Sequence, residues 1–248
     1  DPRKSAFISA SICVLAIALI WFNWQTAVVP LLANAHINGA QSLMEQKRCE
    51  EAFALMDKAF QVKQGSLRSY TGLSYAEMIL QCREQNPALR VQLAQKGRDI
   101  LNETLRTRPS HIRGWIALGG FTNSILENEL ATTHDSSRIA QLTQEAMAAF
   151  QQALTLGPKR QEVYVEWSKV FLVLKDYEGA RQKARECLDI DQKLGACWWQ
   201  LARAEISLGN TKNGSAALQT AEAKGYGTKT EQALLQLANA YLVTEDYE

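Results

Sequence analysis

The side chains that most often do chemistry in proteins are widely scattered along this sequence. No histidine has a metal-binding partner at helical spacing. The three histidines are His36, His111 and His134. The one compact polar group, residues 134–137 (HDSS), is a run of neighbours, whereas a nucleophilic triad needs side chains that converge from separate elements. Asp135 or Ser136 is more simply the N-cap of a following helix.

The glycines give no sign of a phosphate-binding loop. Gly119 and Gly120 lie inside a predicted helix, and residues 225–227 (GYG) indicate a turn between helices. Neighbouring carboxylates such as Glu50 and Glu51 are expected on solvated helix faces. The sequence therefore predicts no catalytic group, no cofactor site and no metal site, and we expect that this segment is not an enzyme.

The five cysteines are an odd number and include no C-x-x-C pair, so they suggest neither a zinc site nor a disulfide framework. We expect small, buried, apolar side chains, because unpaired cysteine is among the most buried residue types. A disulfide between Cys187 and Cys197 across a helical hairpin is the alternative. The cysteines alone do not settle the cellular compartment.

The composition favours a folded, all-α protein. Of the 248 residues, 46% are hydrophobic and 21% charged, which is ample apolar material for a core. Alanine, leucine, glutamine and glutamate are abundant and only five prolines occur, which favours helix. The net charge of +1 provides no field that would attract nucleic acid, so we expect no nucleic-acid partner.

An uncharged, mostly apolar stretch from Ser5 to Trp24 predicts one transmembrane helix. About 20 residues at roughly 1.5 Å rise each match a hydrocarbon core of about 30 Å, so residues 5–24 would contact the lipid bilayer. Trp21 lies near the far end, where indoles prefer the interface, and Arg3 flanks the near end together with Lys4. By the positive-inside rule, the first residues are cytoplasmic and the rest of the chain lies outside.

Two other interpretations of this stretch stay open. A cleavable signal peptide would also have a basic start and a small-residue site, which residues 33–35 (ANA) loosely provide, although the apolar run is long and ends in bulky aromatics. A buried core helix would need an equally apolar partner, and none follows. Because the chain begins with Asp1 rather than methionine, we expect a piece of a longer polypeptide, of which this is the last spanning helix.

Equivalent residues recur at an interval of 34. Ala146, Ala180 and Gly214 are 34 apart, as are Tyr164 and Trp198. Small residues at such positions allow helices to approach closely, and large ones fill the space between them. The interval is that of tetratricopeptide repeats (TPRs), and the sequence resembles that family. The resemblance implies an α-solenoid of antiparallel helix pairs, each completing its core by stacking on its neighbours.

The motif residues fit this resemblance but are not uniform. Trp115 with Leu118 and Gly119 resembles the first helix of a repeat, and residues 176–180 (DYEGA) resemble the turn before a second helix. Gln192 stands where a closing proline is usual. Fifteen extra residues separate Trp115 from the following turn alanine, which predicts an insertion near 124–138.

These patterns predict three regions. Residues 1–30 form the transmembrane helix with a short cytoplasmic start, and residues 31–108 form stretched, irregular TPR-like pairs. Residues 109–248 form TPR repeats, of which the last is incomplete. In such a solenoid the first helices of the pairs line a concave groove, which we expect to hold another protein or a peptide.

The helical register predicts which first-helix residues face the groove. They are Arg113, Ile116, Asn123, Glu162, Val165, Lys169, Trp199, Arg203 and Asn239. Because Trp198 occupies the packing position, one of the two adjacent tryptophans is expected to be exposed, and Trp199 with Arg203 is the preferred binding pair. Packing of Trp199 against a neighbouring repeat is the alternative. Lys169, Arg203 and Asn239 also superficially resemble the clamp by which some TPR domains hold a peptide carboxylate.

The order of features resembles one membrane-protein family more closely. A spanning helix, then residues 30–34 (PLLAN), then repeats such as 153–181 resemble the tail of bacterial O-antigen ligase/polymerase-like proteins with C-terminal TPRs. That resemblance implies a scaffold beside a surface-polysaccharide enzyme in the inner membrane, with the TPR part on the outer face and the catalytic site elsewhere. The alternative is a self-contained, single-span TPR adaptor in envelope assembly or secretion.

Overall fold

The computed structural model describes residues 2–62, 65–82 and 86–245, and every regular element in these ranges is a helix. The chain forms two compact units, of which unit 1 comprises residues 1–83 with 106–108, and unit 2 comprises residues 84–105 with 109–248. The all-α class is as predicted. The division at residues 30 and 108 stays a prediction.

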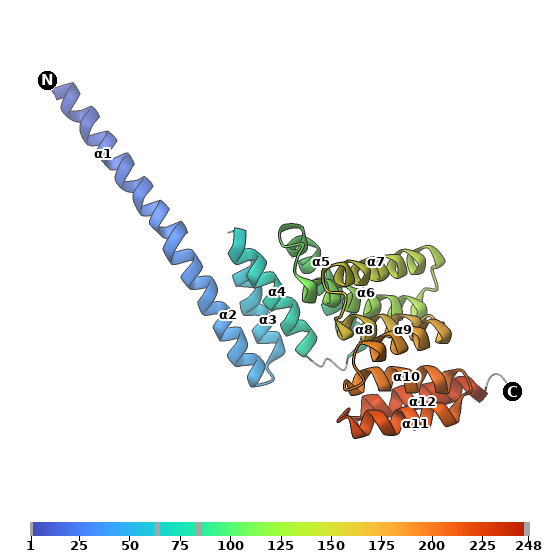
Figure 1. Ribbon diagram of the computed structural model, residues 1–248. Helices are drawn as coiled ribbons and strands as arrows, with labels where there is room; N and C mark the ends of the chain where they lie inside the picture. Colours follow the sequence, from blue (N-terminus) through green and yellow to red (C-terminus); the bar gives the residue numbers. More distant parts are fainter. Residues whose placement is uncertain (1, 63–64, 83–85, 246–248) are drawn as a thin grey trace. The chain divides into compact units, whose positions relative to one another are not determined.

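Unit 1 begins with one uninterrupted helix (Figure 1). It comprises α1 (Pro2–Asn23), a π-helical turn η1 (Trp24–Val28) and α2 (Val29–Glu45). The side chains of Asn23 and Thr26 bond back to the carbonyls of Leu19 and Phe22, so the polar groups near the turn are satisfied within the helix. Pro30, which has no backbone N–H to donate, closely follows this π-helical turn.

From Cys13 onward, the first part of this helix is apolar and uncovered. Ile17 is 66% exposed and Trp21 63%. The described part of the chain contains one helical stretch, Cys13–Glu45, that is long and apolar enough to cross a membrane by length and composition. The transmembrane assignment itself stays a prediction.

The rest of unit 1 is a helical hairpin with a third helix packed on it. α3 (Cys49–Phe60) returns along α2, and α4 (Gly65–Gln81) packs on α3. Small residues form the contact, since Ala40 on α2 and Ala52 on α3 are fully buried. The Tyr75 hydroxyl donates to Asp57 at 2.8 Å, and burial raises the pKa of Tyr75.

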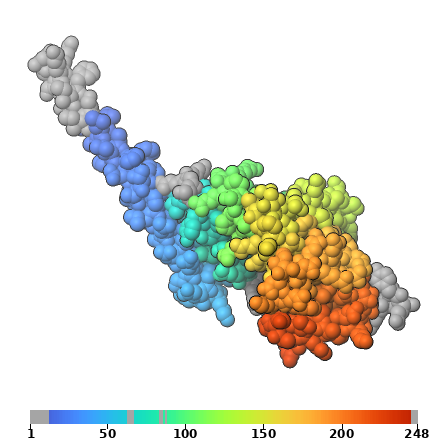
Figure 2. Space-filling view, in the orientation of Figure 1, coloured from blue at the N-terminus to red at the C-terminus, as the bar shows by residue number. Residues whose placement is uncertain are grey.

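Unit 2 is a stack of antiparallel helix pairs. Its helices are α5 (Pro87–Thr107), α6 (Ile112–Thr132), α7 (Ser136–Leu156), α8 (Gln161–Val173), α9 (Tyr177–Ile190), α10 (Gly195–Ser207), α11 (Thr211–Ala223) and α12 (Glu231–Glu245). Of α5, the part up to residue 105 belongs to unit 2. The pairs are α6–α7, α8–α9 and α10–α11, and the first helices α6, α8, α10 and α12 contact one another in that order. Figure 2 shows these pairs as successive colour bands from green to red.

The 34-residue period corresponds to a repeated hydrogen bond. The indole N–H of Trp115 donates to the Pro109 carbonyl at 2.7 Å, and that of Trp198 donates to the Gln192 carbonyl at 2.9 Å. The Tyr164 hydroxyl reaches the equivalent carbonyl, that of Pro158, at 3.5 Å. Each aromatic thus ties a first helix to the carbonyl six residues earlier. Because the carbonyl is the acceptor, glutamine can replace proline at position 192.

Gly214, the other departure from the motif, has a packing explanation. A Cβ there would overlap the side chain of Ile206 and lie 3.1 Å from the Ala202 carbonyl oxygen. Since Ile206 is fully buried, α10 and α11 can approach only if this position carries no side chain. The departure therefore preserves the close contact that alanine provides in the other pairs.

The insertion predicted near 124–138 lengthens two helices instead of forming a long loop. α6 has 21 residues against 13 in α8, and α7 has 21 against 14 in α9, so about two turns are added to each. The turn between them contains His134 in a left-handed conformation (φ 54°). Asp135 is the N-cap of α7, as predicted, since its carboxylate accepts from the amides of Ser137 and Arg138.

The expectation of unpaired cysteines is wrong for four of the five. Cys187 and Cys197 form a disulfide between the end of α9 and the start of α10, as the alternative proposed. Cys49 and Cys82 form a second, between α3 and the end of α4. The latter two are 33 residues apart in sequence, and only the antiparallel return of the chain brings them together. Cys13 is free but exposed, so the expectation of a buried side chain is wrong for it as well.

Two adjacent glycines in α6 test how closely the pairs pack. A Cβ at position 119 would overlap the ring of Phe150 on α7, whereas a Cβ at position 120 would have no closer neighbour than a Glu166 oxygen at 3.8 Å. We expect Gly119→Ala to lower the unfolding free energy by about 1–3 kcal/mol. Gly120→Ala, the matched control, should leave it unchanged or raise it by up to about 1 kcal/mol through better helix propensity. Chemical denaturation measures both, and equal effects would contradict the packing described.

Candidate functional site

The predicted groove residues do lie on the first helices of unit 2, but they differ in exposure. Arg113 on α6, Glu162 on α8 and Asn239 on α12 are exposed, and Lys169 on α8 is partly buried. Ile116 is partly buried and Val165 is buried. Whether these residues bind a partner stays a prediction.

The expectation that Trp199 is exposed is wrong. Its side chain is fully buried, stacked on Tyr226 with ring centroids 5.3 Å apart and packed with Ala221 and Ala233. Trp198, the neighbour, is partly buried and uses its N–H in the repeated hydrogen bond. Trp199 is therefore covered by the turn after α11 and by α12, which the register of its own helix did not reveal.

Asn123 is likewise more buried than predicted. It is only 9% exposed, and its side-chain oxygen has no hydrogen-bond partner among the described residues. The indole N–H of Trp199 is also unpartnered there. Neither side chain is available at the surface, so the exposed part of the predicted groove is smaller than the sequence indicated.

Arg203, on α10, differs from the other predicted groove residues because its charge is partly buried and has no ion-pair partner among the described residues. Its guanidinium donates to the Gln200 side-chain oxygen at 3.2 Å, its Nε has no partner, and no carboxylate lies within ion-pair distance among the described residues. Burial lowers the pKa of Arg203 to about 10, a shift that Tyr226 and Glu127 oppose. The residue is still a cation at neutral pH, and it lacks the counter-charge that buried cations usually have.

Lys169 occupies the position that corresponds to Arg203 one repeat earlier, and an ion pair compensates its charge. Its ammonium lies 2.6 Å from Glu166, in an i,i+3 pair on α8. Both influence Tyr226, whose pKa is raised by burial and by Glu166 and lowered by Lys169 and Arg203. We call Glu127, Glu166, Lys169, Arg203 and Tyr226 the inner charged cluster. It joins α6, α8 and α10, and Arg203 is its one cation without an ion pair to the described residues.

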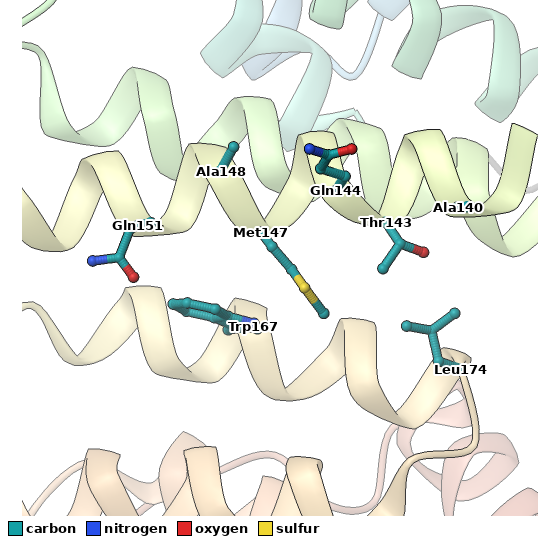
Figure 3. A pocket seen from close by; sticks show the side chains of 8 residues that line it. All are labelled: Ala140, Thr143, Gln144, Met147, Ala148, Gln151, Trp167 and Leu174. Carbon is teal, nitrogen blue, oxygen red and sulfur yellow. The ribbon is translucent and has the colours of Figure 1, made fainter.

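A second surface, which the sequence did not indicate, lies between α7 and α8. This α7–α8 groove is lined by Ala140, Thr143, Gln144, Met147, Ala148, Gln151, Trp167 and Leu174. Met147 projects from α7 between Trp167 of α8 and Leu174, the C-cap of α8 (Figure 3). The Thr143 hydroxyl and the Trp167 N–H have no hydrogen-bond partner among the described residues. Trp167 itself is held between Phe150, at 5.9 Å, and the Lys183 ammonium, at 4.6 Å.

The next repeat fills the corresponding space with charged side chains. In the 34-residue register Met147 corresponds to Arg181, and Gln151 to Arg185. Arg185 lies 3.0 Å and Arg181 3.9 Å from Glu205, which is 3% exposed. Phe171 replaces Glu205 in α8. The α7–α8 groove is thus uncharged and open where its counterpart is occupied by long ion-paired side chains.

A metal ion needs several histidine, cysteine or acidic side chains close together. No three such side chains among the described residues gather in positions that could hold a metal ion. Whether the segment has an activity of its own stays a prediction from the sequence.

Solved structures with a similar fold are TPR proteins. The thermophilic TPR protein TTC0263 of Thermus thermophilus matches with a TM-score of 0.62 at 14% identity, over 85% of this chain and 99% of its own. MamA residues 41 to the end from Desulfovibrio magneticus match with a TM-score of 0.54 at 12% identity, over 80% and 97%. No family model and no curated protein matches the sequence. The fold is therefore that of a TPR solenoid.

Replacing Arg203 by an uncharged residue measures how much the burial of its charge lowers the free energy of unfolding. Because the cation has no ion pair among the described residues, we expect Arg203→Met to leave the unfolding free energy unchanged or to raise it by about 1–2 kcal/mol. Arg113→Met, on the exposed start of α6, should change it by less than about 0.5 kcal/mol. Thermal and chemical denaturation of the full chain measure both. A loss of more than about 2 kcal/mol on replacing Arg203 would identify it as a structural residue.

Proposed function

We propose that this protein is a membrane-anchored scaffold that binds an acidic segment of another protein on the first-helix face of unit 2. The observation that carries the proposal is Arg203, a partly buried cation whose Nε and charge have no partner among the described residues. A carboxylate from a partner, placed at the part of the Arg203 side chain that stays accessible, would supply the missing counter-charge. Lys169, one repeat away on α8, extends the positive side of the same cluster.

The TPR fold supports a scaffold in general, because stacked helix pairs present an extended surface for partners. The tether in the proposal is the exposed apolar helix α1, with Trp21 near its outer end and Trp24 at the start of η1. Two disulfides support placing the TPR part outside the cytoplasm, since such bonds persist in oxidising compartments. The narrower proposal is that the chain is the tail of an inner-membrane surface-polysaccharide ligase or polymerase. It depends on the sequence resemblance alone.

Partner binding can be tested with the full chain purified in detergent. We expect proteins recovered from a membrane and periplasmic extract by the wild-type chain to be lost with Arg203→Met, and recovery to fall as salt rises because an ion pair is screened. Lys212→Met, a cation on the outer helix α11, should behave as wild type. Equal recovery by all three chains would contradict the assignment of this face, provided that the Arg203 variant is folded.

Anchoring and compartment can be tested together in cells. We expect the chain to stay in the membrane fraction after alkaline carbonate washing, and Leu15→Arg with Ile17→Arg to release it, since charge in a spanning helix is costly. Maleimide labelling without reductant should modify at most Cys13, because the other cysteines are paired. Reactivity of all five cysteines before reduction would place the TPR part in a reducing compartment.

A further inference from the structure

The exposed side of the first long helix stays apolar beyond its aromatic end. Leu31 is 67% exposed and Leu32 49%, compared with 52% for Trp24, where the predicted span ends. Helix α1, the turn η1 and α2 follow one another without a break, so Leu31 lies about 10 Å beyond Trp24 along the same axis. The exposed apolar surface therefore continues past the end of the predicted span.

Two polar side chains near η1 are hydrogen-bonded within the helix. The Asn23 amide donates to the Leu19 carbonyl at 2.9 Å, and the Thr26 hydroxyl donates to the Phe22 carbonyl at 2.8 Å. Bonds to the helix's own backbone lower the cost of placing such groups where water is scarce. The stretch around η1 can therefore tolerate a less polar environment than bulk water.

Beyond Leu32 the exposed side of α2 becomes polar. Leu32 is the last large hydrophobic side chain of α2 that is exposed, and the other side of this helix packs on α3. The exposed residues that follow include Asn34, Ala35, Asn38, Gln41 and Ser42. Asn38 lies two helical turns after Leu31 and so on the same face. This face thus changes from apolar to polar within about 10 Å.

The dimensions of a bilayer relate this change of polarity to its headgroup layer. A hydrocarbon core of about 30 Å within a bilayer of about 40–45 Å leaves a headgroup layer of about 5–8 Å on each side. The uncharged, mostly apolar stretch from Ser5 to Leu32 extends for about 42 Å, and a stretch longer than the core is accommodated by tilting. With Trp24 at the core boundary and a tilt of about 40°, Leu31 would lie about 8 Å beyond that boundary, and Asn38 about 8 Å farther out.

We propose that Leu31 and Leu32 form a second membrane contact, which lies in the lipid headgroup layer beside the spanning segment. The proposal rests on the proposed anchoring of α1 and extends the lipid contact beyond residues 5–24. Lipid is favoured as the occupant because the leucines continue the proposed lipid-facing surface of the same helix, and no charged residue intervenes. Two contacts on one helix would restrict its tilt, and with it the orientation of α3, which packs on α2.

Quenching of a fluorophore by labelled lipids tests the depth of Leu31. In a Cys13→Ser background the other four cysteines are paired, so one introduced cysteine is the only thiol available for labelling. The full chain carries Leu31→Cys or Asn38→Cys in vesicles of phosphatidylethanolamine and phosphatidylglycerol, and a nitroxide on the lipid headgroup is the quencher. We expect at least threefold more quenching at position 31 than at position 38. Equal quenching at the two positions would overturn the inference.

A third position distinguishes this inference from the anchoring on which it rests. Ile17 is 66% exposed within the predicted span, so a fluorophore on Ile17→Cys should be quenched by a nitroxide deep in the acyl chains. Quenching at position 17 without quenching at position 31 would leave the anchor in place and overturn the second contact. Absence of quenching at position 17 would overturn both.

A charge beside Leu31 tests whether the leucines hold this face in the headgroup layer. In the Leu31→Cys chain, Leu32→Asp should reduce quenching at least twofold, because a carboxylate is costly to remove from water. Asn38→Asp, the matched control, adds the same charge beyond the contact and should leave the quenching unchanged. Equal quenching in all three chains would show that the span alone sets the depth, and would contradict a contact made by the leucines.

Discussion

Close contact between paired helices at small residues is the constraint on which this structure depends. Ala146, Ala180 and Gly214 recur one repeat apart, and each lies where a second helix meets its first helix. The neighbouring large side chains leave no room for more, as Gly214 under Ile206 illustrates. Because interiors are packed to crystal density, this spacing fixes how each pair sits on the next. The surfaces left over for function are those that the stacking does not use.

The parts of this fold that repeat could be predicted, because equivalent residues make the same contact in every pair. The interval of 34 located the pairs, and the hydrogen bonds of Trp115 and Trp198 to carbonyls six residues earlier show its physical basis. The apolar start of the chain was equally plain from composition. Both signals depend on local sequence, where propensity and spacing are strongest.

What the sequence missed depends on contacts between distant residues. Trp199 is buried by Tyr226 and α12, although its register alone indicated exposure. The bond between Cys49 and Cys82 depends on how α3 and α4 meet, and no spacing rule predicts it. The α7–α8 groove arises because one repeat replaces Arg181, Arg185 and Glu205 with uncharged residues, which becomes visible only when repeats are compared in space.

The two candidate surfaces of unit 2 differ in the physics that would stabilise a complex. At the inner charged cluster a buried cation without an ion pair to the described residues favours an anionic partner, and the gain falls as salt screens the charges. In the α7–α8 groove the lining is uncharged, so burial of apolar area supplies the affinity and salt has little influence there. Binding at the first-helix face would therefore weaken with salt, and binding in the α7–α8 groove would not. Such separation follows from the architecture, since first and second helices present opposite sides of the same stack.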